Sequence, residues 1–179
     1  KLVSDLLFLA RSETGMIEVE HQPTPLDEVL TEASREGEVL ARKKSITITL
    51  HGVHEPIVVD GDAYRLKQLF MILISNAISY THEHGRVDVH VERDGDRGHI
   101  TIQDSGVGIA ETEVPHVFER FYRAKTSTAH ARGGAGLGLS IAKWIIEAHH
   151  GTISLTSTQG VGTTVTLILP ILVPTTVEA

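Results

Sequence analysis

The spacing of hydrophobic residues along the chain predicts four helices. Residues 2–13 place leucine at i, i+4 and i+7, which forms one apolar stripe on a helix. Gly15 follows as a stop signal. We expect this helix to be the end of a longer one whose partners, in a bundle or coiled coil, lie outside the chain. The other segments with helical spacing are 26–43, the residues from Asp62 as N-cap to about Thr81, and the residues that follow 133–139.

Alternation of apolar and polar residues predicts strands between these helices. Short glycine-containing turns at 94–98 and 159–162 join two pairs of strands into hairpins. Strands and helices mix without strict β-α-β alternation, so the expected fold class is α+β, a two-layer sandwich with one mixed sheet and helices on one face. Residues 105–135 show little periodicity beyond 114–122 and form the candidate mobile loop. The predicted strands are 17–21, 45–50, 57–59, 86–93, 99–104, 152–158 and 163–169.

Charge and composition limit the partners that the chain can bind. The net charge is -7, with 16 Lys and Arg against 23 Asp and Glu, which argues against a broad nucleic-acid footprint and requires any phosphate site to be local. The absence of cysteine excludes disulfides and thiolate metal sites. Apolar runs such as 70–74 are too short to cross a bilayer, so we expect no membrane contact by this segment. Because the first residue is Lys1 rather than Met, we expect a fragment of a longer protein.

The helix after Asp62 carries a polar edge beside its apolar stripe. Ile72, Asn76 and Tyr80 lie at i, i+4 and i+8 and so share one face, with Ser79 beside them. The carbonyl oxygen of an asparagine suits Mg²⁺, which takes few protein ligands and keeps its waters and substrate phosphates. The alternative is a buried asparagine that caps a neighbouring loop. The apolar stripe that should face the sheet consists of Leu66, Leu69, Leu73 and Ala77.

A second candidate site is the sequence DSGVGIA at 104–110, directly after a predicted strand. The Asp104 carboxylate can accept a hydrogen bond from the exocyclic amine of a purine, which would give specificity for adenine. Gly106 and Gly108 allow the chain to turn sharply beneath a flat ring. The alternative is a D-S-G turn without a ligand. A hydroxyl that supports the carboxylate, directly or through water, would come from Thr163 or Thr164, unless their hairpin turn is a simple structural one.

The sequence GGAGLGL at 133–139 places four glycines among seven residues, immediately before a helix. Glycine costs roughly 0.5–1 kcal/mol relative to alanine in a regular element, so the cluster needs a compensating reason. Glycines before a helix N-terminus expose unpaired N–H groups and the positive end of the helix dipole, which together bind phosphate without net basic charge. The stretch is not a Walker loop, because no Gly-Lys-Ser/Thr follows, and it is not a dinucleotide fingerprint, because no strand immediately precedes it.

Taken in order, these segments resemble the ATP-binding catalytic domain of sensor histidine kinases, within the wider family that includes DNA gyrase, the ninety-kilodalton heat-shock chaperone and the mismatch-repair ATPase MutL. The resemblance spans almost the whole chain. The sequence at 2–15 is similar to the second helix of that family's dimerization and phosphoacceptor hairpin. Five ordered motifs look like the N box at 65–81, the G1 box at 104–110, the F box at 118–124, the G2 box at 133–142 and the G3-like strand pair at 160–170.

The resemblance implies a domain organisation and a reaction. Residues 1–15 would be the end of the hairpin's second helix, 16–170 the catalytic ATP-binding domain and 171–179 a C-terminal tail. The reaction would be phosphorylation of a histidine by ATP with Mg²⁺, followed by transfer to an aspartate of a response regulator. The phosphoacceptor is expected outside the chain, because none of the 11 histidines lies in an H-E/D-x-x-x-P context on a helix. The chain would therefore be inactive alone.

The same resemblance assigns roles to single residues. Asp104 would read the adenine, Asn76 would bind Mg²⁺ and Arg123 would reach a phosphate, with Asn76 and Arg123 as the catalytic residues. Residues 105–135 would form a lid over ATP. The residues implied in cofactor binding are Asn76, Ser79, Tyr80, Asp104, Gly106, Gly108, Ile109, Arg123, Gly134, Gly136, Leu137, Gly138, Leu139 and Thr163.

Two positions depart from the family's pattern. Ile72 stands where the family usually has Asn, Glu or His, and it can neither bind a metal nor carry a proton. Ser79 stands where a phosphate-binding Lys is common. We therefore expect weak ATP affinity or slow turnover. Phosphate binding should depend on Asn76, Arg123 and either Lys125 or Arg132.

The resemblance also implies the partners of the parent protein. These are its own phosphoacceptor hairpin and a response regulator, and the parent would be a homodimer in the inner membrane with this domain in the cytoplasm. One alternative function is a degenerate nucleotide-binding regulatory module, and another is a different ATPase or serine kinase of the wider family. The pairs His82 with His84 and His149 with His150 are interpreted as solvated helix ends rather than metal ligands.

Overall fold

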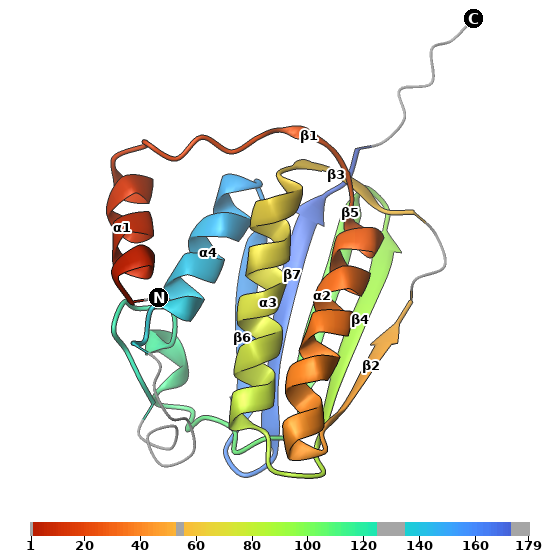
Figure 1. Cartoon of the computed structure of the whole chain (residues 1–179), viewed down its shortest axis with the longest axis vertical. Coiled ribbons are helices and arrows are strands. Elements are labelled where there is room, and N and C mark those ends of the chain that lie inside the picture. The colour runs from red at the N-terminus through yellow and green to blue at the C-terminus, as the bar shows by residue number, and fades with distance from the viewer. Residues whose placement is uncertain (1, 53–55, 125–134, 173–179) are drawn as a thin grey trace, which may run out of the picture.

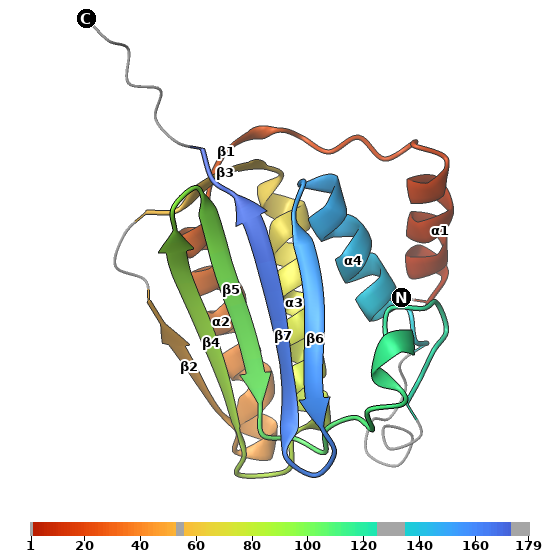
Figure 2. The ribbon, with the colours of Figure 1, turned by 180° about the vertical axis from the view of Figure 1, so that it is seen from behind.

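The computed structural model describes residues 2–52, 56–124 and 135–172, and its centre is a five-stranded mixed sheet with helices on one face (Figure 1). Viewed from behind, the other face of the sheet carries no helix of the described segments (Figure 2). The strand order is β2-β4-β5-β7-β6, in which β2 and β4 are parallel and the other neighbours are antiparallel. The α+β two-layer sandwich is therefore confirmed. The strands are β2 Thr47–His51, β4 Arg86–Asp94, β5 Arg97–Asp104, β6 Thr152–Thr158 and β7 Gly162–Pro170.

The helices form where the apolar spacing predicts them. They are α1 Leu2–Glu13, α2 Leu26–Ala41, α3 Ala63–Tyr80 and α4 Gly138–Ala148, with short 3₁₀ turns η1 Arg42–Lys44 and η2 Val114–His116. The Asp62 carboxylate accepts a hydrogen bond of 3.0 Å from the Arg65 N–H and so caps α3 as expected. Every helix within the described ranges is too short or too polar to cross a membrane.

The core lies between α3 and the helix-covered face of the sheet. The predicted stripe of α3 is buried, and alternate residues of β4 and β5 meet it from the sheet. One continuous apolar cluster results, so α3 is fixed against the strand that ends at Asp104. The principal contributors to this cluster are Leu66, Leu69, Leu73, Ala77, Val87, Val89, Ile100, Ile102 and Leu167.

The predicted strand at 17–21 is wrong. The strand of this region is β1 Gln22–Pro25, which pairs antiparallel with β3 Val58–Gly61 in a separate two-stranded sheet. The alternation at 17–21 is real, because Ile17 and Val19 are half-buried between exposed neighbours, but the segment has no strand partner within the described ranges. Proline is tolerated in β1 because β1 is an edge strand, which pairs with β3 on one side only among the described residues.

Residues 171–172, directly after β7, bond to the turn between β4 and β5 and to the small sheet. The Ile171 N–H donates to the Asp96 carbonyl at 2.9 Å, and the Leu172 N–H donates to the Val58 carbonyl at 2.7 Å. Ile171 is buried in the core. The remainder of the expected tail, 173–179, lies outside the described residues.

His149 is buried at the end of α4, so its interpretation as a solvated helix end is wrong. Its Nε2 accepts the N–H of Asp62 at 3.0 Å, which leaves the proton on Nδ1, 2.7 Å from the Ile145 carbonyl oxygen. Burial lowers the pKa of the His149 imidazole. Among the described residues, no group of three or more His, Cys, Asp or Glu side chains is arranged to hold a metal.

Acid is expected to destabilise the fold through His149. Its lowered pKa means that its contribution is fully present above the ordinary histidine pKa of about 6.5 and is lost as the pH falls below it. The free energy of unfolding in urea, measured from pH 8 to pH 5, should fall more steeply in the wild type than in His149→Gln. His150→Gln, at an exposed neighbour whose charge is the smallest of the causes that lower the pKa of His149, should stay close to the wild type. Equal slopes for all three proteins would contradict this assignment.

Candidate functional site

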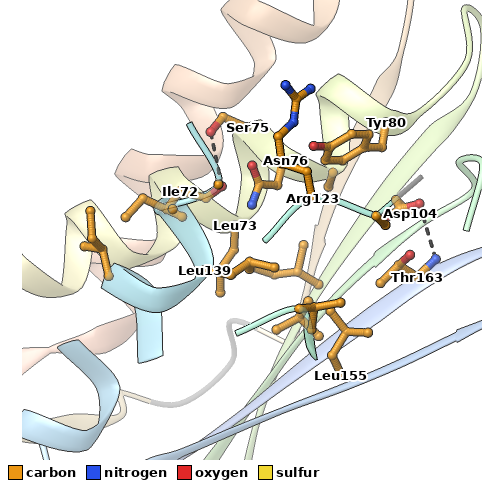
Figure 3. Close-up of a pocket in the computed structure, with 18 of the residues that line it drawn as sticks. Ile72, Leu73, Ser75, Asn76, Tyr80, Asp104, Arg123, Leu139, Leu155 and Thr163 are labelled. Carbon is orange, nitrogen blue, oxygen red and sulfur yellow. Dashed lines mark hydrogen bonds between the residues drawn. The ribbon is translucent and has the colours of Figure 1, made fainter. Parts of the chain in front are cut away.

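A cavity of about 500 Å³ opens between α3, the start of α4 and the ends of β5 and β7 (Figure 3). The three sequence segments singled out above all contribute to its wall. In the view of Figure 3, Asp104 and Thr163 lie at one end of the cavity and Ile72 at the other, with Asn76 and Leu139 between them. The predicted residues that line it are Asn76, Tyr80, Asp104, Gly108, Ile109, Arg123, Gly136, Leu137, Gly138, Leu139 and Thr163.

Of the polar residues along the edge of α3, Asn76 and Tyr80 line the cavity and Ser79 does not. The half-buried Asn76 side chain makes no hydrogen bond with another described residue, which argues against the alternative of a loop cap. Its amide is therefore available to a ligand. Ser79 is not part of the cavity wall, and its hydroxyl donates to the Ser75 carbonyl of the same helix at 2.7 Å. Ile72, one of the two departures, lines the cavity.

The Asp104 carboxylate is held at the end of β5 by two backbone amides. Its Oδ1 accepts the Gly106 N–H at 2.8 Å and the Thr163 N–H at 3.3 Å. Burial raises the pKa of Asp104 to about 6, and the two N–H bonds act in the opposite direction. Both bonds fall on Oδ1, so Oδ2 is the oxygen that can accept from a ligand.

The expected support by a threonine hydroxyl takes a different form. Thr163 holds Asp104 through its backbone N–H, while its hydroxyl lies 2.9 Å from the Ser157 hydroxyl. Thr163 is opposite Asp104 in the antiparallel ladder of β5 and β7, which brings its amide to the carboxylate. Thr164 is the partner of Gln103 in that ladder and does not line the cavity.

The glycines after Asp104 serve close contacts between chain segments. A Cβ on Gly106 would lie 2.4 Å from the Tyr80 carbonyl oxygen, and Gly106 itself does not line the cavity. Gly108 has φ +63°, and a Cβ there would lie 2.0 Å from the Thr158 carbonyl oxygen. Side chains at these positions would push the turn away from α3 and β6. The glycines thus fix Asp104 beside α3.

The glycine-rich stretch before α4 has a similar structural role at one position. Gly136 has φ +72°, and a Cβ there would lie 2.7 Å from the Tyr122 carbonyl oxygen. Its own carbonyl accepts the Phe121 N–H at 2.9 Å. Gly136 therefore fixes the end of the F box against the start of α4. Among the side chains that the structure describes, none caps the N-terminus of α4, where Gly138 and Leu139 line the cavity.

Some predicted residues fall in the segment that the structure does not describe. Gly134, Lys125 and Arg132 lie there, within residues 125–134 of the expected lid at 105–135. Arg123, at the edge of the described segment, lines the cavity.

Sequence reasoning missed the contribution of α1. Phe8 meets Trp144 of α4 edge-on with ring centroids 5.0 Å apart, and the Arg65 guanidinium lies 5.1 Å from the Phe8 centroid. Leu9 is buried, so α1 is packed against α3 and α4. This packing brings Asp5 into the cavity wall. The leucine stripe of α1 gave no signal for that contact, because it indicates a helix but not its partner.

Comparison with known proteins identifies the family. The family model for histidine kinase-, DNA gyrase B- and HSP90-like ATPases matches residues 61–173. The chain belongs to this ATPase family.

Two curated relatives are the circadian input-output histidine kinase CikA of Synechococcus elongatus and the probable sensor protein PcoS of Escherichia coli. CikA is 34% identical over 172 residues, 95% of this chain and 23% of CikA. PcoS is 39% identical over 154 residues, 86% of this chain and 32% of PcoS. This ATP-binding domain therefore spans about a quarter to a third of the length of these relatives.

Solved structures agree with the family. The mycobacterial sensor histidine kinase MprB superposes with a TM-score of 0.71 and 28% identity, over 84% of this chain and 98% of that one. Full-length ShkA in complex with AMPPNP superposes with a TM-score of 0.81 and 27% identity, over 95% of this chain and 35% of that one. The chain is therefore a sensor histidine kinase ATP-binding domain, and it shares its fold with a protein that was solved in complex with AMPPNP.

Proposed function

We propose that this domain binds ATP with Mg²⁺ and phosphorylates a histidine that lies outside the segment, for onward transfer to an aspartate of a response regulator. The observation that carries the proposal is the convergence on one cavity of Asp104, Asn76 and the start of α4. Asp104 offers an acceptor for a purine amine, Asn76 an amide oxygen, and the start of α4 N–H groups without a partner among the described residues. These are the groups that adenine, Mg²⁺ and phosphates require.

Each of these groups has its own part of the nucleotide to bind. Asp104 would accept the adenine amine with Oδ2. The N-terminal amides of α4 would bind phosphate oxygens, and Arg123 would neutralise charge on the phosphoryl group. The Asn76 amide oxygen would be the protein ligand of Mg²⁺, which when bound offsets the negative charge of the phosphates. Catalysis of this kind consists of positioning and charge neutralisation, because the phosphoacceptor itself is the nucleophile.

The proposal extends to the parent protein. We place the acceptor histidine on a hairpin of which α1 is the end, and we expect the hairpin to make the parent a homodimer. The relatives are named sensor proteins and sensor kinases, which supports a response regulator as the second partner. A cytoplasmic location beneath a membrane sensor is part of the same proposal.

A second candidate function is a regulatory module that binds ATP without transferring phosphate. Ile72 favours it, because an apolar side chain lines the cavity where the family usually has a polar one. Mixing the domain with a separate protein that carries a phosphoacceptor hairpin, and with ³²P-labelled ATP, separates the two functions. Label on the hairpin histidine supports the kinase. Binding of Mg-ATP without label supports the module, and no binding at all contradicts both.

A polar residue introduced at position 72 is expected to add a contact at the phosphate end of the site and so to increase affinity for Mg-ATP. Ile72→Asn should increase affinity for Mg-ATP by roughly tenfold, the effect of one added hydrogen bond to a charged group. Ile72 is half-buried and lies close to Gly138, since a Cβ added to Gly138 would be 3.3 Å from the Ile72 Cγ2. The asparagine side chain is smaller than that of isoleucine, so it fits in the same space. Calorimetric titration with and without Mg²⁺ measures the change. Ile72→Leu is the control for altered packing, and an equal gain in that variant would contradict the prediction.

A further inference from the structure

Lys44, in η1, closes the C-terminal end of α3. Its ammonium group donates hydrogen bonds to the carbonyl oxygens of Ile78 at 3.0 Å, Ser79 at 2.8 Å and Thr81 at 3.2 Å. The last carbonyls of a helix have no partner within it and carry partial negative charge, which a cation stabilises. Lys44 is half-buried, and its own carbonyl accepts the His84 N–H at 3.2 Å, so the side chain starts from a fixed backbone.

The remaining carbonyls of this last turn have partners too. The Ala77 oxygen accepts from the Thr81 N–H at 3.1 Å and from the Thr81 hydroxyl at 2.7 Å. The Tyr80 oxygen accepts the Val107 N–H at 3.1 Å. With Lys44, every carbonyl from 77 to 81 is satisfied. The Tyr80 bond differs from the others because it leads to the turn that follows Asp104.

We propose that Lys44 is a positioning residue for the adenine end of the site, an inference that rests on the proposed function. Lys44 holds the last turn of α3, which sets the position of the Tyr80 carbonyl. That carbonyl binds the Val107 N–H and is in close contact with Gly106. Gly106 in turn donates to Asp104 Oδ1. The ammonium group therefore fixes the acid that accepts the adenine amine without touching the nucleotide.

The geometry excludes a different role for this cation. Ser79 stands where the family commonly has a phosphate-binding lysine, and Lys44 bonds to the carbonyl of that residue. A lysine ammonium has three N–H donors, and all three of Lys44 are used on backbone carbonyls. Lys44 therefore does not replace the absent lysine at a phosphate.

Substitution of Lys44 tests the proposal through nucleotide affinity. Lys44→Met should weaken binding of ADP and ATP by the same factor, roughly tenfold or more, because the loss lies at the adenine end that both share. Lys44→Arg, which keeps a cation with several donors, should recover most of the affinity. The matched control is Lys43→Met, at the exposed preceding residue of η1, which should bind as the wild type does. Lys44→Gln, with an amide donor, replaces Lys44→Met if that variant does not fold, and should show an intermediate loss.

Two readouts separate positioning from simple stability. Calorimetry well below the melting temperature reports a changed dissociation constant if Lys44 positions the site, but only fewer binding-competent molecules if it merely stabilises the fold. Amide hydrogen exchange needs no nucleotide: Val107 should exchange faster in Lys44→Met, while Ile100 in the core of β5 stays protected.

The outcomes also distinguish failure of this inference from failure of the proposed function. If the wild type binds neither ADP nor ATP, the proposed function fails, while selective exposure of Val107 still supports the role of Lys44 in placing the turn. An unchanged dissociation constant in Lys44→Met overturns the inference. So does equal acceleration of exchange at Val107 and Ile100, because that result reports global loosening.

Discussion

Replacing Asp104 with asparagine is expected to remove measurable adenine nucleotide binding and, at neutral pH, to make the protein more stable. Both backbone amides that hold the carboxylate bond to Oδ1, so an asparagine oxygen can take the same place. The amide nitrogen then replaces Oδ2 and presents a donor to the donor amine of adenine. Two donors that face each other cannot form a hydrogen bond, so the free energy of binding should become less favourable by ~3 kcal/mol or more. This is a loss of affinity of at least ~100-fold.

The gain in stability follows from the raised pKa of Asp104, about 6 in the folded protein. Because the folded pKa lies above the ordinary value, ionisation opposes folding, and wild-type stability from this group is lost as the pH rises from about 4 to 6. At pH 7.5 the whole difference is present, about 1–3 kcal/mol in favour of Asp104→Asn, and below pH 4 it disappears.

Two measurements on the same variant check these expectations. Calorimetric titration with ADP gives the affinity, and urea unfolding at pH 4 and pH 7.5 gives the free energy of unfolding. A variant that binds ADP normally would show that Asp104 does not read the base. A variant that is less stable than the wild type at pH 7.5 would show that the buried charge does not oppose folding.

Replacing Asn76 with alanine is expected to abolish phosphoryl transfer, with a loss of at least ~100-fold in rate. The Asn76 amide is the one α3 side chain at the cavity that we assign to Mg²⁺, and Ile72, one turn earlier, offers no substitute ligand. Affinity for Mg-ATP should fall by a similar factor. Affinity for ADP without Mg²⁺ should change little, because Asp104 and the turn after it stay in place.

The comparison of Mg-ATP with ADP in the absence of Mg²⁺ is the control for Asn76→Ala, and it needs no second variant. The domain is titrated with ADP in the absence of Mg²⁺ and with Mg-ATP in its presence, and label transfer to a phosphoacceptor hairpin is measured in parallel. Equal losses with and without Mg²⁺ would mean that Asn76 supports the cavity wall rather than a metal.

Most of the fold was predictable because local signals and packing agree. The long helix α3 has a capping Asp62, an apolar stripe and no internal glycine or proline, and it forms as predicted. The failure at 17–21 has a physical cause, since alternation reports alternate burial and not the presence of a partner strand. His149 was misread because its position at a helix end does not reveal that the start of α3 covers it.

The candidate site was predictable as far as its motifs, but not its supporting contacts. Asn76, Asp104 and Gly138 each stand in a pattern that suggests a ligand, and the structure brings them to one cavity. Lys44 and Asp5 stand in no pattern. Their positions depend on which helices pack together, and hydrophobic spacing does not encode that.

The contact between Phe8 and Trp144 also provides an optical signal. Trp144 is the only tryptophan in the chain, so all tryptophan fluorescence of the protein comes from this one indole, which lies beside α1. Removal of the Phe8 ring would expose more of the half-buried indole to water and shift its emission to longer wavelength. Attachment of α1 to the rest of the domain can thus be followed by fluorescence, without a label, while nucleotide is added.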